Sequence, residues 1–394
     1  MNLDPCRIAF IHHPFSAKFA LLESMPISLN LVKKLDEAGH EIDLYVWEDD
    51  NSIYRKSFSK NVRICSLSSG SPSRVVKRKL DWLNFFNLPL IHFDCYRKKK
   101  YDCIFGVGLV GSCLARIMSK YSYAPYVYVN DEFPSSYSLP SNSYWMSKER
   151  QAAIDASLII VPDEQRATHL YSELNISMSD VKHAILPNAP LINNHIEYID
   201  WATRLKLPAN SIPLLHAGSI ADWVQIPEIL SSMPSWPEQT VLIINGRTPV
   251  NKNYKQELAH LMIEKRIIWT DKPLTEIELN SLVNFSLASF ALYRDLGDNI
   301  RYIGWSAGKL LRSIKCGRPV IASRYPSLEF IEHNELGKLI THPAEIPAAV
   351  DDLIKNKIRY QENCLCYAEN ELDINKWWLQ IVKQLKSVAG IKLS

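Results

Sequence analysis

Short apolar runs alternate along the first half of the chain with longer stretches in which apolar residues recur at helical spacing. The short runs, which are typical of buried parallel strands, lie at 7–11, 41–47, 101–107, 125–129 and 157–161. The stretches with helical spacing lie between and after them, at 22–35, 108–118, 149–156 and 164–174. Strands that alternate with helices in this way predict a parallel sheet with helices on its faces.

The second half of the chain repeats this alternation. Strand-like runs lie at 213–217, 240–245, 267–270, 287–292 and 320–322, and helix-like stretches at 254–265, 276–281 and 309–316. A chain of 394 residues also exceeds the size at which a single core usually stops growing. The sequence therefore predicts an α/β protein with two doubly wound, Rossmann-like domains.

Polar stretches and the tail set the predicted domain boundaries. We expect an N-terminal domain at 1–190, an irregular linker at 191–212 and a C-terminal domain at 213–372. The tail at 373–394 has an amphipathic helical pattern, so we expect a helix that returns toward the N-terminal domain.

The stretch at 306–323 combines a small polar loop, a helix and a short apolar strand. Ser306 and Gly308 come just before the predicted helix, where backbone N–H groups and the positive end of the helix dipole attract anions. Lys309 adds a positive charge at the same place. These features predict an anion site, with phosphate as the expected ligand. The alternative interpretation is an ordinary loop–helix–strand unit with a solvated lysine.

Composition and charge narrow the class of protein. Hydrophobic residues make up 47% of the chain and charged residues 22%, as in soluble globular enzymes. The net charge of +3 gives no overall signal for nucleic-acid binding. No apolar run is long enough to span a bilayer, and the start of the sequence is unlike a secretory signal. The eight cysteines contain no C-x-x-C pair, so we expect reduced thiols in the cytoplasm.

One segment, 54–100, is strongly basic. It holds twelve lysines and arginines against two aspartates, and Trp82, Phe85 and Phe86 lie between the basic clusters. Basic residues interleaved with aromatic ones favour an anionic membrane surface. The alternative is a solvated helix that packs its aromatic side inward. Nucleic acid is not expected as a partner, because the rest of the chain offers no basic track.

Polar residues follow two of the predicted strands of the first domain. Asp131 and Glu132 come after the strand at 125–129, where a carboxylate can act as a general base or can simply cap a turn. His12, His13 and Ser16 follow the first strand, where we expect a ligand-facing loop or an ordinary capping or core role.

Several motifs together carry a resemblance to a known family. They are Ser306-x-x-Lys309 running into Cys316–Ser323, Glu329 with Gly337, Leu186–Asn188, His216–Ser219, Asn245-Gly246 and Tyr128–Pro134. In this order they resemble the GT-B-fold nucleotide-sugar glycosyltransferases, especially the retaining bacterial family (group 1, family 4 type) that builds polysaccharides and glycolipids. The resemblance implies two Rossmann-like domains that face each other across a cleft, with the donor held by the C-terminal domain.

The resemblance also implies roles for residues of this chain. The expected donor-phosphate residues are Gly218, Ser219, Arg247, Ser306, Ala307, Gly308, Lys309 and Arg312. The expected sugar or base contacts are Tyr302, Trp305 and Glu329, and Asp131 or Glu132 would act in catalysis. No D-x-D motif and no clustered metal ligands occur, so we expect no metal and no cofactor beyond the NDP-sugar substrate.

Two family features are replaced in this chain. Gly304 and Arg312 stand where the family usually has two glutamates. Ser219 and Val224 or Gln225 stand where it usually has an arginine and a lysine that bind the diphosphate. The expected activity is transfer of a sugar, with retention favoured over inversion, to a lipid-linked or polysaccharide acceptor at the inner face of a bacterial membrane. The alternatives are a GT-B-fold sugar-nucleotide epimerase and a catalytically silent protein that binds sugar nucleotides or partners.

Overall fold

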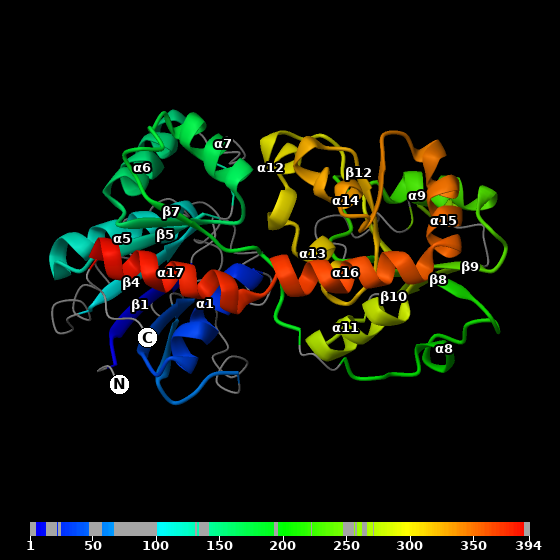
Figure 1. The fold of residues 1–394 in the computed structure, drawn as a ribbon, viewed down its shortest axis with the longest axis horizontal. Coiled ribbons are helices and arrows are strands. Elements are labelled where there is room, and N and C mark those ends of the chain that lie inside the picture. The colour runs from blue at the N-terminus through cyan, green and yellow to red at the C-terminus, as the bar shows by residue number, and fades with distance from the viewer. Residues whose placement is uncertain are drawn as a thin grey trace. The chain divides into compact units, whose positions relative to one another are not determined.

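The chain divides into two compact units. The computed structural model describes residues 5–12, 22, 25–46, 57–66, 101–130, 132–133, 142–192, 196–221, 223–246, 256, 258–261, 266–270 and 272–389. One unit comprises Met1–Asn188 together with Ile374–Ser394, and the other comprises Ala189–Asp373 (Figure 1). The final segment of the chain therefore belongs to the first unit.

A parallel sheet of seven strands, in the order β3-β2-β1-β4-β5-β6-β7, forms the centre of the first unit. The strands are β1 (Arg7–His12), β2 (Glu41–Val46), β3 (Val62–Ser66), β4 (Cys103–Val107), β5 (Tyr126–Val129), β6 (Leu158–Val161) and β7 (His183–Ile185). Strands β4, β5 and β6 are buried at every position, as their uninterrupted apolar sequences predict. The chain adds β2 and β3 on one side of β1 and then crosses to β4 on the other.

The helices that the structure describes in the same unit are α1 (Pro26–Glu37), α5 (Gly108–Ser122), α6 (Asn142–Asp155), α7 (Glu164–Leu174) and α17 (Ile374–Ala389). Helix α17 packs on β6 and β7 and buries Trp378, Ile381 and Leu385. At the start of α1, the backbone N–H of Ile27 donates to Oδ1 of Asn188, at 2.8 Å. The last residue of the first segment thus caps the first helix of its own unit.

The second unit is built on a parallel sheet of six strands in the order β10-β9-β8-β11-β12-β13. The strands are β8 (Ile212–Ala217), β9 (Thr240–Asn245), β10 (Ile267–Thr270), β11 (Ala288–Ala291), β12 (Val320–Ser323) and β13 (Gly337–Ile340). The two doubly wound α/β sheets that the alternation predicted are therefore confirmed.

The helices of the second unit are mostly short. They are α8 (Trp201–Arg204), α9 (Ile226–Ser232), α11 (Glu276–Phe285), α12 (Asp298–Arg301), α13 (Gly308–Lys315), α14 (Phe330–His333), α15 (Ile346–Lys355) and α16 (Lys357–Glu371). Single 3-10 turns lie at Met233–Ser235, Ala259–Leu261, Gly304–Ser306, Pro326–Leu328 and Pro343–Glu345. Of the helix predicted at 254–265, the structure describes only the turn at Ala259–Leu261 and two neighbouring residues.

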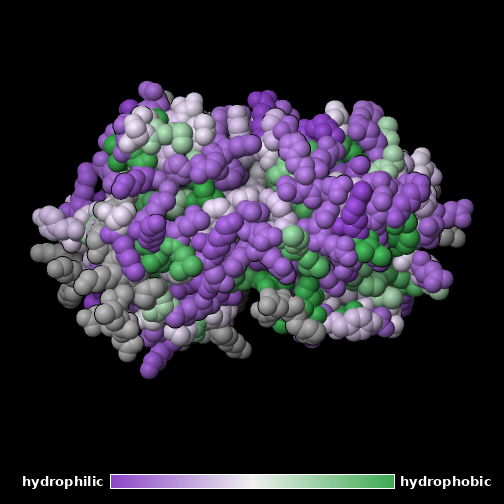
Figure 2. Space-filling view, viewed as in Figure 1, coloured by the Kyte–Doolittle hydropathy of each residue, from purple (hydrophilic) through white to green (hydrophobic). Residues whose placement is uncertain are grey.

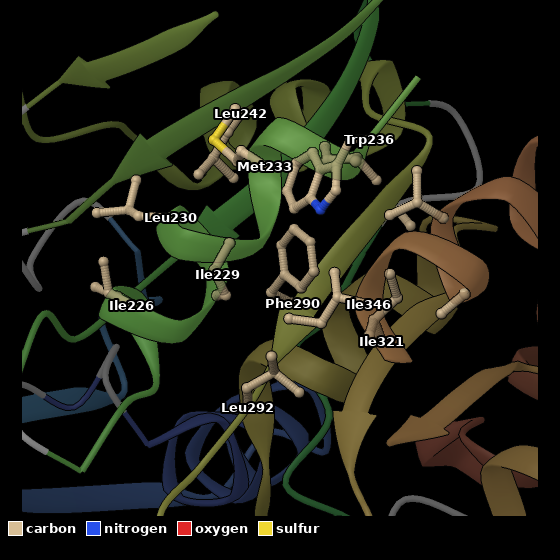
Figure 3. Close-up of a cluster of buried hydrophobic side chains, with 14 of the residues drawn as sticks. Ile226, Ile229, Leu230, Met233, Trp236, Leu242, Phe290, Leu292, Ile321 and Ile346 are labelled. Carbon is tan, nitrogen blue, oxygen red and sulfur yellow. The ribbon is translucent and has the colours of Figure 1, made fainter. Parts of the chain in front are cut away.

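An apolar cluster under one face of the second sheet forms the larger core of this unit (Figure 3). The rings of Trp236 and Phe290 stack at its centre, with 5.6 Å between their centroids. Ile226 and Ile229 reach the same cluster from α9 (Figure 3). The face of the molecule in Figure 2 is mostly hydrophilic, and its apolar residues lie in scattered patches.

Residues that were predicted to form a linker pack into the second unit. Trp201 of α8 is 2% exposed, and its Nε1–H donates to Oγ of Ser281 on α11, at 3.2 Å. Leu215 of β8 and Leu282 of α11 belong to the same cluster. The segment after 190 is therefore anchored by a buried tryptophan within the described chain.

Among the helices of the described ranges, none has both the length and the apolar character that crossing a bilayer requires.

Candidate functional site

The order of strands in the second sheet reverses between β8 and β11. The chain runs from β8 outward to β9 and β10, and then returns to place β11 on the other side of β8. In open parallel sheets, ligands bind beyond the carboxyl ends of the strands at such a switch point. β8 ends at Ala217 and β11 at Ala291, so Gly218 and Tyr293 lie at this position.

The loops after β8 and β9 approach each other closely at the switch point. A Cβ atom on Gly246 would lie 1.9 Å from the carbonyl oxygen of Gly218, so only glycine fits there. Gly218 itself has φ of +121°, a conformation that side chains disfavour. Glycine at 218 therefore lets the backbone turn sharply beside the strand ends, and glycine at 246 lets the two loops approach each other.

Lys309, in the first turn of α13, reaches the same place. Its Nζ lies 4.5 Å from the centroid of the Tyr293 ring, a cation–π contact. Its Cδ would lie 3.6 Å from a Cβ atom on Gly218. The side chain thus joins the start of α13 to the ends of both β8 and β11.

Within the described part of the chain, no acidic side chain pairs with Lys309. Burial lowers the pKa of its ammonium group to about 7, and no carboxylate among the described residues forms an ion pair with it. His216 of β8 is fully buried nearby, and burial together with Lys309 lowers its pKa to about 3. We assign the imidazole as neutral, with Nε2–H donating to the carbonyl oxygen of Ser219 at 3.2 Å.

The start of α13 supplies backbone N–H groups. Ala307 is the N-cap residue, and no side chain caps the helix there. The Ser306 hydroxyl instead donates to the carbonyl oxygen of Ile303, at 2.5 Å. The uncapped N–H groups and the Lys309 ammonium group together form a site with the chemistry to bind an anion.

Arg312, which was predicted to bind phosphate, is held elsewhere. Its guanidinium group forms a two-pronged ion pair with Glu276, at 2.8 and 3.2 Å, and also donates to Asn280. Glu276 and Asn280 lie on α11, and Arg312 is 8% exposed. Arg312 therefore joins α11 to α13, and we withdraw it from the phosphate site.

The predicted sugar and base contacts do not all lie with Lys309. Nε1–H of Trp305 donates to the hydroxyl of Tyr367 on α16, at 3.1 Å, so Trp305 packs in the core contact between these segments. Tyr302 is half-buried after α12, and Glu329 is exposed at the start of α14. Arg247 lies outside the described residues.

Comparison with known proteins identifies the fold. No family model and no curated protein sequence matches the chain. Sucrose-phosphate synthase from Thermosynechococcus elongatus has a TM-score of 0.75 and 15% identity, and the match covers 98% of this chain and 99% of that one. Anabaena HepE in complex with UDP-glucose has a TM-score of 0.67 and 16% identity, and the match covers 97% of this chain and 100% of that one. WaaG, a glycosyltransferase involved in lipopolysaccharide biosynthesis, has a TM-score of 0.64 and 14% identity, and the match covers 98% of this chain and 100% of that one.

The chain has the GT-B fold. GT-B proteins contain two Rossmann-like domains, as the resemblance implied, and identities this low establish the fold alone. The Lys309 site lies beyond the carboxyl ends of the strands of the second sheet.

The first GT-B unit contains a buried polar cluster at the carboxyl end of β5. The Tyr128 hydroxyl donates to Glu149 of α6, and Nδ2 of Asn130 donates to Tyr128 Oη at 2.8 Å. Asn130 also donates to the carbonyl oxygen of Glu132, at 2.9 Å. Glu132 keeps an exposed surface, yet desolvation raises its pKa, an effect that Arg166 opposes. This network fixes the backbone beside Glu132, whereas Asp131 lies outside the described residues.

The other residues of the first unit that were predicted to have a functional role lie only partly within the described chain. His12 is buried at the end of β1, while His13 and Ser16 lie outside the described residues. Of the basic segment 54–100, the structure describes 57–66, which contains β3. Arg63 of this strand donates to Oδ1 of Asp43 on β2, at 2.6 Å. One of the twelve cations is thus part of the sheet.

Sequence reasoning missed Tyr293 and Glu149 as parts of these sites. Tyr293 follows the strand beside the switch point, and that position was a usable signal in the sequence. Glu149 was hidden, because nothing in the local pattern indicates that a glutamate in a helix accepts from a tyrosine on a strand.

Proposed function

We propose that this protein is a glycosyltransferase that takes its sugar from a nucleoside diphosphate sugar. The carrying observation is the ammonium group of Lys309, which lies at the switch point with no acidic partner among the described residues. Phosphate oxygens would accept from this group and from the first N–H groups of α13. Gly218 would let the backbone approach the diphosphate, and Ser219 would contact it from the next position.

The chemistry required of such a site follows from the leaving group. Negative charge grows on the nucleoside diphosphate as the glycosidic bond breaks, so fixed positive charge stabilises the transition state more than the bound donor. Lys309 and the helix N-terminus would supply that charge without a metal ion or a cofactor. We propose a retaining reaction from the family resemblance, in which Asp131 and Glu132 help to orient the sugar or the acceptor.

We propose a lipid-linked or polysaccharide acceptor in the synthesis of a bacterial surface glycan. Two observations support this choice: the excess of basic residues in 54–100, and the likeness of fold to WaaG. Basic and aromatic residues of this segment would bring the enzyme to the anionic inner face of the membrane.

A sugar-nucleotide epimerase is the second candidate. A putative UDP-N-acetylglucosamine 2-epimerase from Listeria monocytogenes shares the fold. An epimerase would convert a nucleotide sugar without any acceptor, whereas a transferase would release the nucleotide in proportion to the acceptor that is glycosylated. Product analysis with and without an acceptor therefore distinguishes an epimerase from a transferase. A catalytically silent protein would neither convert the nucleotide sugar nor release the nucleotide.

The test of the donor site is a binding experiment. UDP-, GDP-, ADP- and dTDP-sugars are added in turn, and a bound donor raises the melting temperature because it binds only the native state. We expect one nucleotide to raise Tm, and Lys309→Ala to abolish that rise. Lys315→Ala is the matched control, because Lys315 lies at the opposite end of the same helix. Unchanged donor binding in Lys309→Ala would contradict the assignment.

A further inference from the structure

The Lys309 ammonium group has an aromatic ring where a half-buried lysine usually has a carboxylate. The ring belongs to Tyr293, which is 5% exposed, and the distance from Nζ to its centroid is 4.5 Å. Burial raises the pKa of the Tyr293 hydroxyl, so the phenol stays neutral throughout the physiological range. The ring therefore attracts the ammonium group through its π face and adds no negative charge.

The backbone of Tyr293 is fixed independently of its ring. Its N–H donates to Oγ of Ser323 at 2.8 Å, and that hydroxyl and the Tyr325 hydroxyl both donate to the Tyr293 carbonyl oxygen at 3.0 Å. An isolated antiparallel bridge also joins Tyr293 to Val224, in the segment after β8. The ring is thus presented from a backbone that is tied to the ends of neighbouring strands.

Among the described residues of the elements that pack against α13, none forms an ion pair with Lys309. Glu276 of α11 is held by Arg312, and Tyr367 of α16 accepts a hydrogen bond from Trp305. Burial holds the pKa of the Cys364 thiol of α16 above its usual range, so this group is neutral. His216 of β8 is neutral as well, because its pKa is lowered to about 3. Desolvation alone lowers the pKa of Lys309.

We propose that Tyr293 is a positioning residue, whose ring holds the Lys309 ammonium group at the ends of β8 and β11 and leaves its charge available to a nucleoside diphosphate. A carboxylate in the same place would neutralise the ammonium group and repel the phosphates. The π face avoids both effects. This inference rests on the proposed function, because it gives the ammonium group a diphosphate to bind.

The test compares aromatic and non-aromatic residues at one position. UDP is titrated into the wild type, Tyr293→Phe, Tyr293→Leu, Tyr293→Met and Lys309→Ala, and the affinity is measured by calorimetry. Tyr293→Phe keeps the ring and should bind as the wild type does. Tyr293→Leu and Tyr293→Met fill similar space without a π face, and we expect them to bind about 3- to 30-fold more weakly. Two non-aromatic variants are used so that a folding defect in one does not decide the result.

A second measurement needs no nucleotide. Acetic anhydride labels neutral amines, and mass spectrometry reports the labelling of Lys309 as a function of pH. The wild type and Tyr293→Phe should share one midpoint. Loss of the π face should lower the midpoint in Tyr293→Leu and Tyr293→Met by about half a pH unit, because the ammonium form loses an attraction.

The outcomes separate this inference from the proposed function. If Tyr293→Leu and Tyr293→Met bind UDP as tightly as the wild type while Lys309→Ala does not, the donor site stands and the role of Tyr293 is wrong. If the wild type binds none of the nucleotides, the proposed function fails, and the labelling midpoints decide the role of Tyr293. Equal midpoints in all the Tyr293 variants would overturn it.

Discussion

At the scale of single residues, the environment of Lys309 decides what the site can do. A lysine on a helix surface is normally fully charged, but burial lowers the pKa of this one to about 7. A bound diphosphate would favour the ammonium form and raise that pKa again. Binding of the donor is therefore coupled to uptake of a proton whenever the pH exceeds the pKa of the free protein.

This coupling gives a prediction for the effect of pH. A nucleotide sugar should bind with constant affinity below pH of about 7, where Lys309 is already charged in the free protein. Above that value the affinity should fall by up to about tenfold per pH unit, until the pKa of the complex is reached. Calorimetric titrations across this range measure the slope. An affinity that stays flat up to pH of about 9 would contradict the prediction.

The sequence predicted that Lys309 and Arg312 both bind the donor phosphates. The structure places Lys309 at the strand ends, whereas the guanidinium group of Arg312 is paired with Glu276. Lys309 could be placed because it begins a helix after a loop, a local feature. Arg312 lies one turn further, and its partners on α11 are more than thirty residues away in sequence. A pairing over that distance leaves no local signal, so the sequence could not indicate that the charge is already neutralised.

At the scale of elements, the contact between α11 and α13 rests on this arginine. Its side chain is buried, whereas Glu276 is half-exposed, so the ion pair itself contributes only modestly to stability. Loss of the buried arginine side chain would cost more.

The alternation of strands and helices was predictable from the sequence, because burial imposes a characteristic spacing and composition of apolar residues on each segment. Short helices such as α9 were not predicted, because they hold too few apolar positions to show a period.

We expect Arg312→Met to destabilise the protein without weakening the donor site. Removing the link to Glu276 and Asn280 should cost about 1–2 kcal/mol, which lowers Tm by roughly 2–4 °C in a protein of this size. Nucleotide affinity should stay within about twofold of the wild type. The double variant Glu276→Gln/Arg312→Met is the control, because it removes both charges together. A large loss of affinity in Arg312→Met alone would return the arginine to the phosphate site.

At the scale of the whole molecule, the two units differ in the number of chain segments that form them. The second unit is one continuous segment, Ala189–Asp373, whereas the first is completed by Ile374–Ser394. The sequence predicted a terminal helix from its amphipathic pattern. Its place on β6 and β7 depends on which strands lie at that side of the sheet, and a helical pattern does not encode this.

Deleting the chain after Asp373 should damage the first unit and spare the second. The deletion exposes the surface of β6 and β7 that Trp378, Ile381 and Leu385 cover, and burial of three such side chains is worth several kcal/mol, about 1.5–3 for each. Hydrogen exchange should then rise in β6 and β7 and remain slow in β8 and β11. Equal loss of protection in both sheets would show that the two units do not respond separately.

The position of α17 also has a consequence for synthesis. When Asn188 has been made, the 185 residues of Ala189–Asp373 must follow before the first residue of α17 exists. At about 5–20 residues per second, the ribosome needs roughly 10–40 s for this stretch. During that interval the nascent first unit presents the bare apolar flank of β6 and β7, while the second unit can be completed behind it. The first unit is therefore synthesised first but finishes folding last. Its exposed apolar flank at β6 and β7 is a place where a chaperone can bind during synthesis.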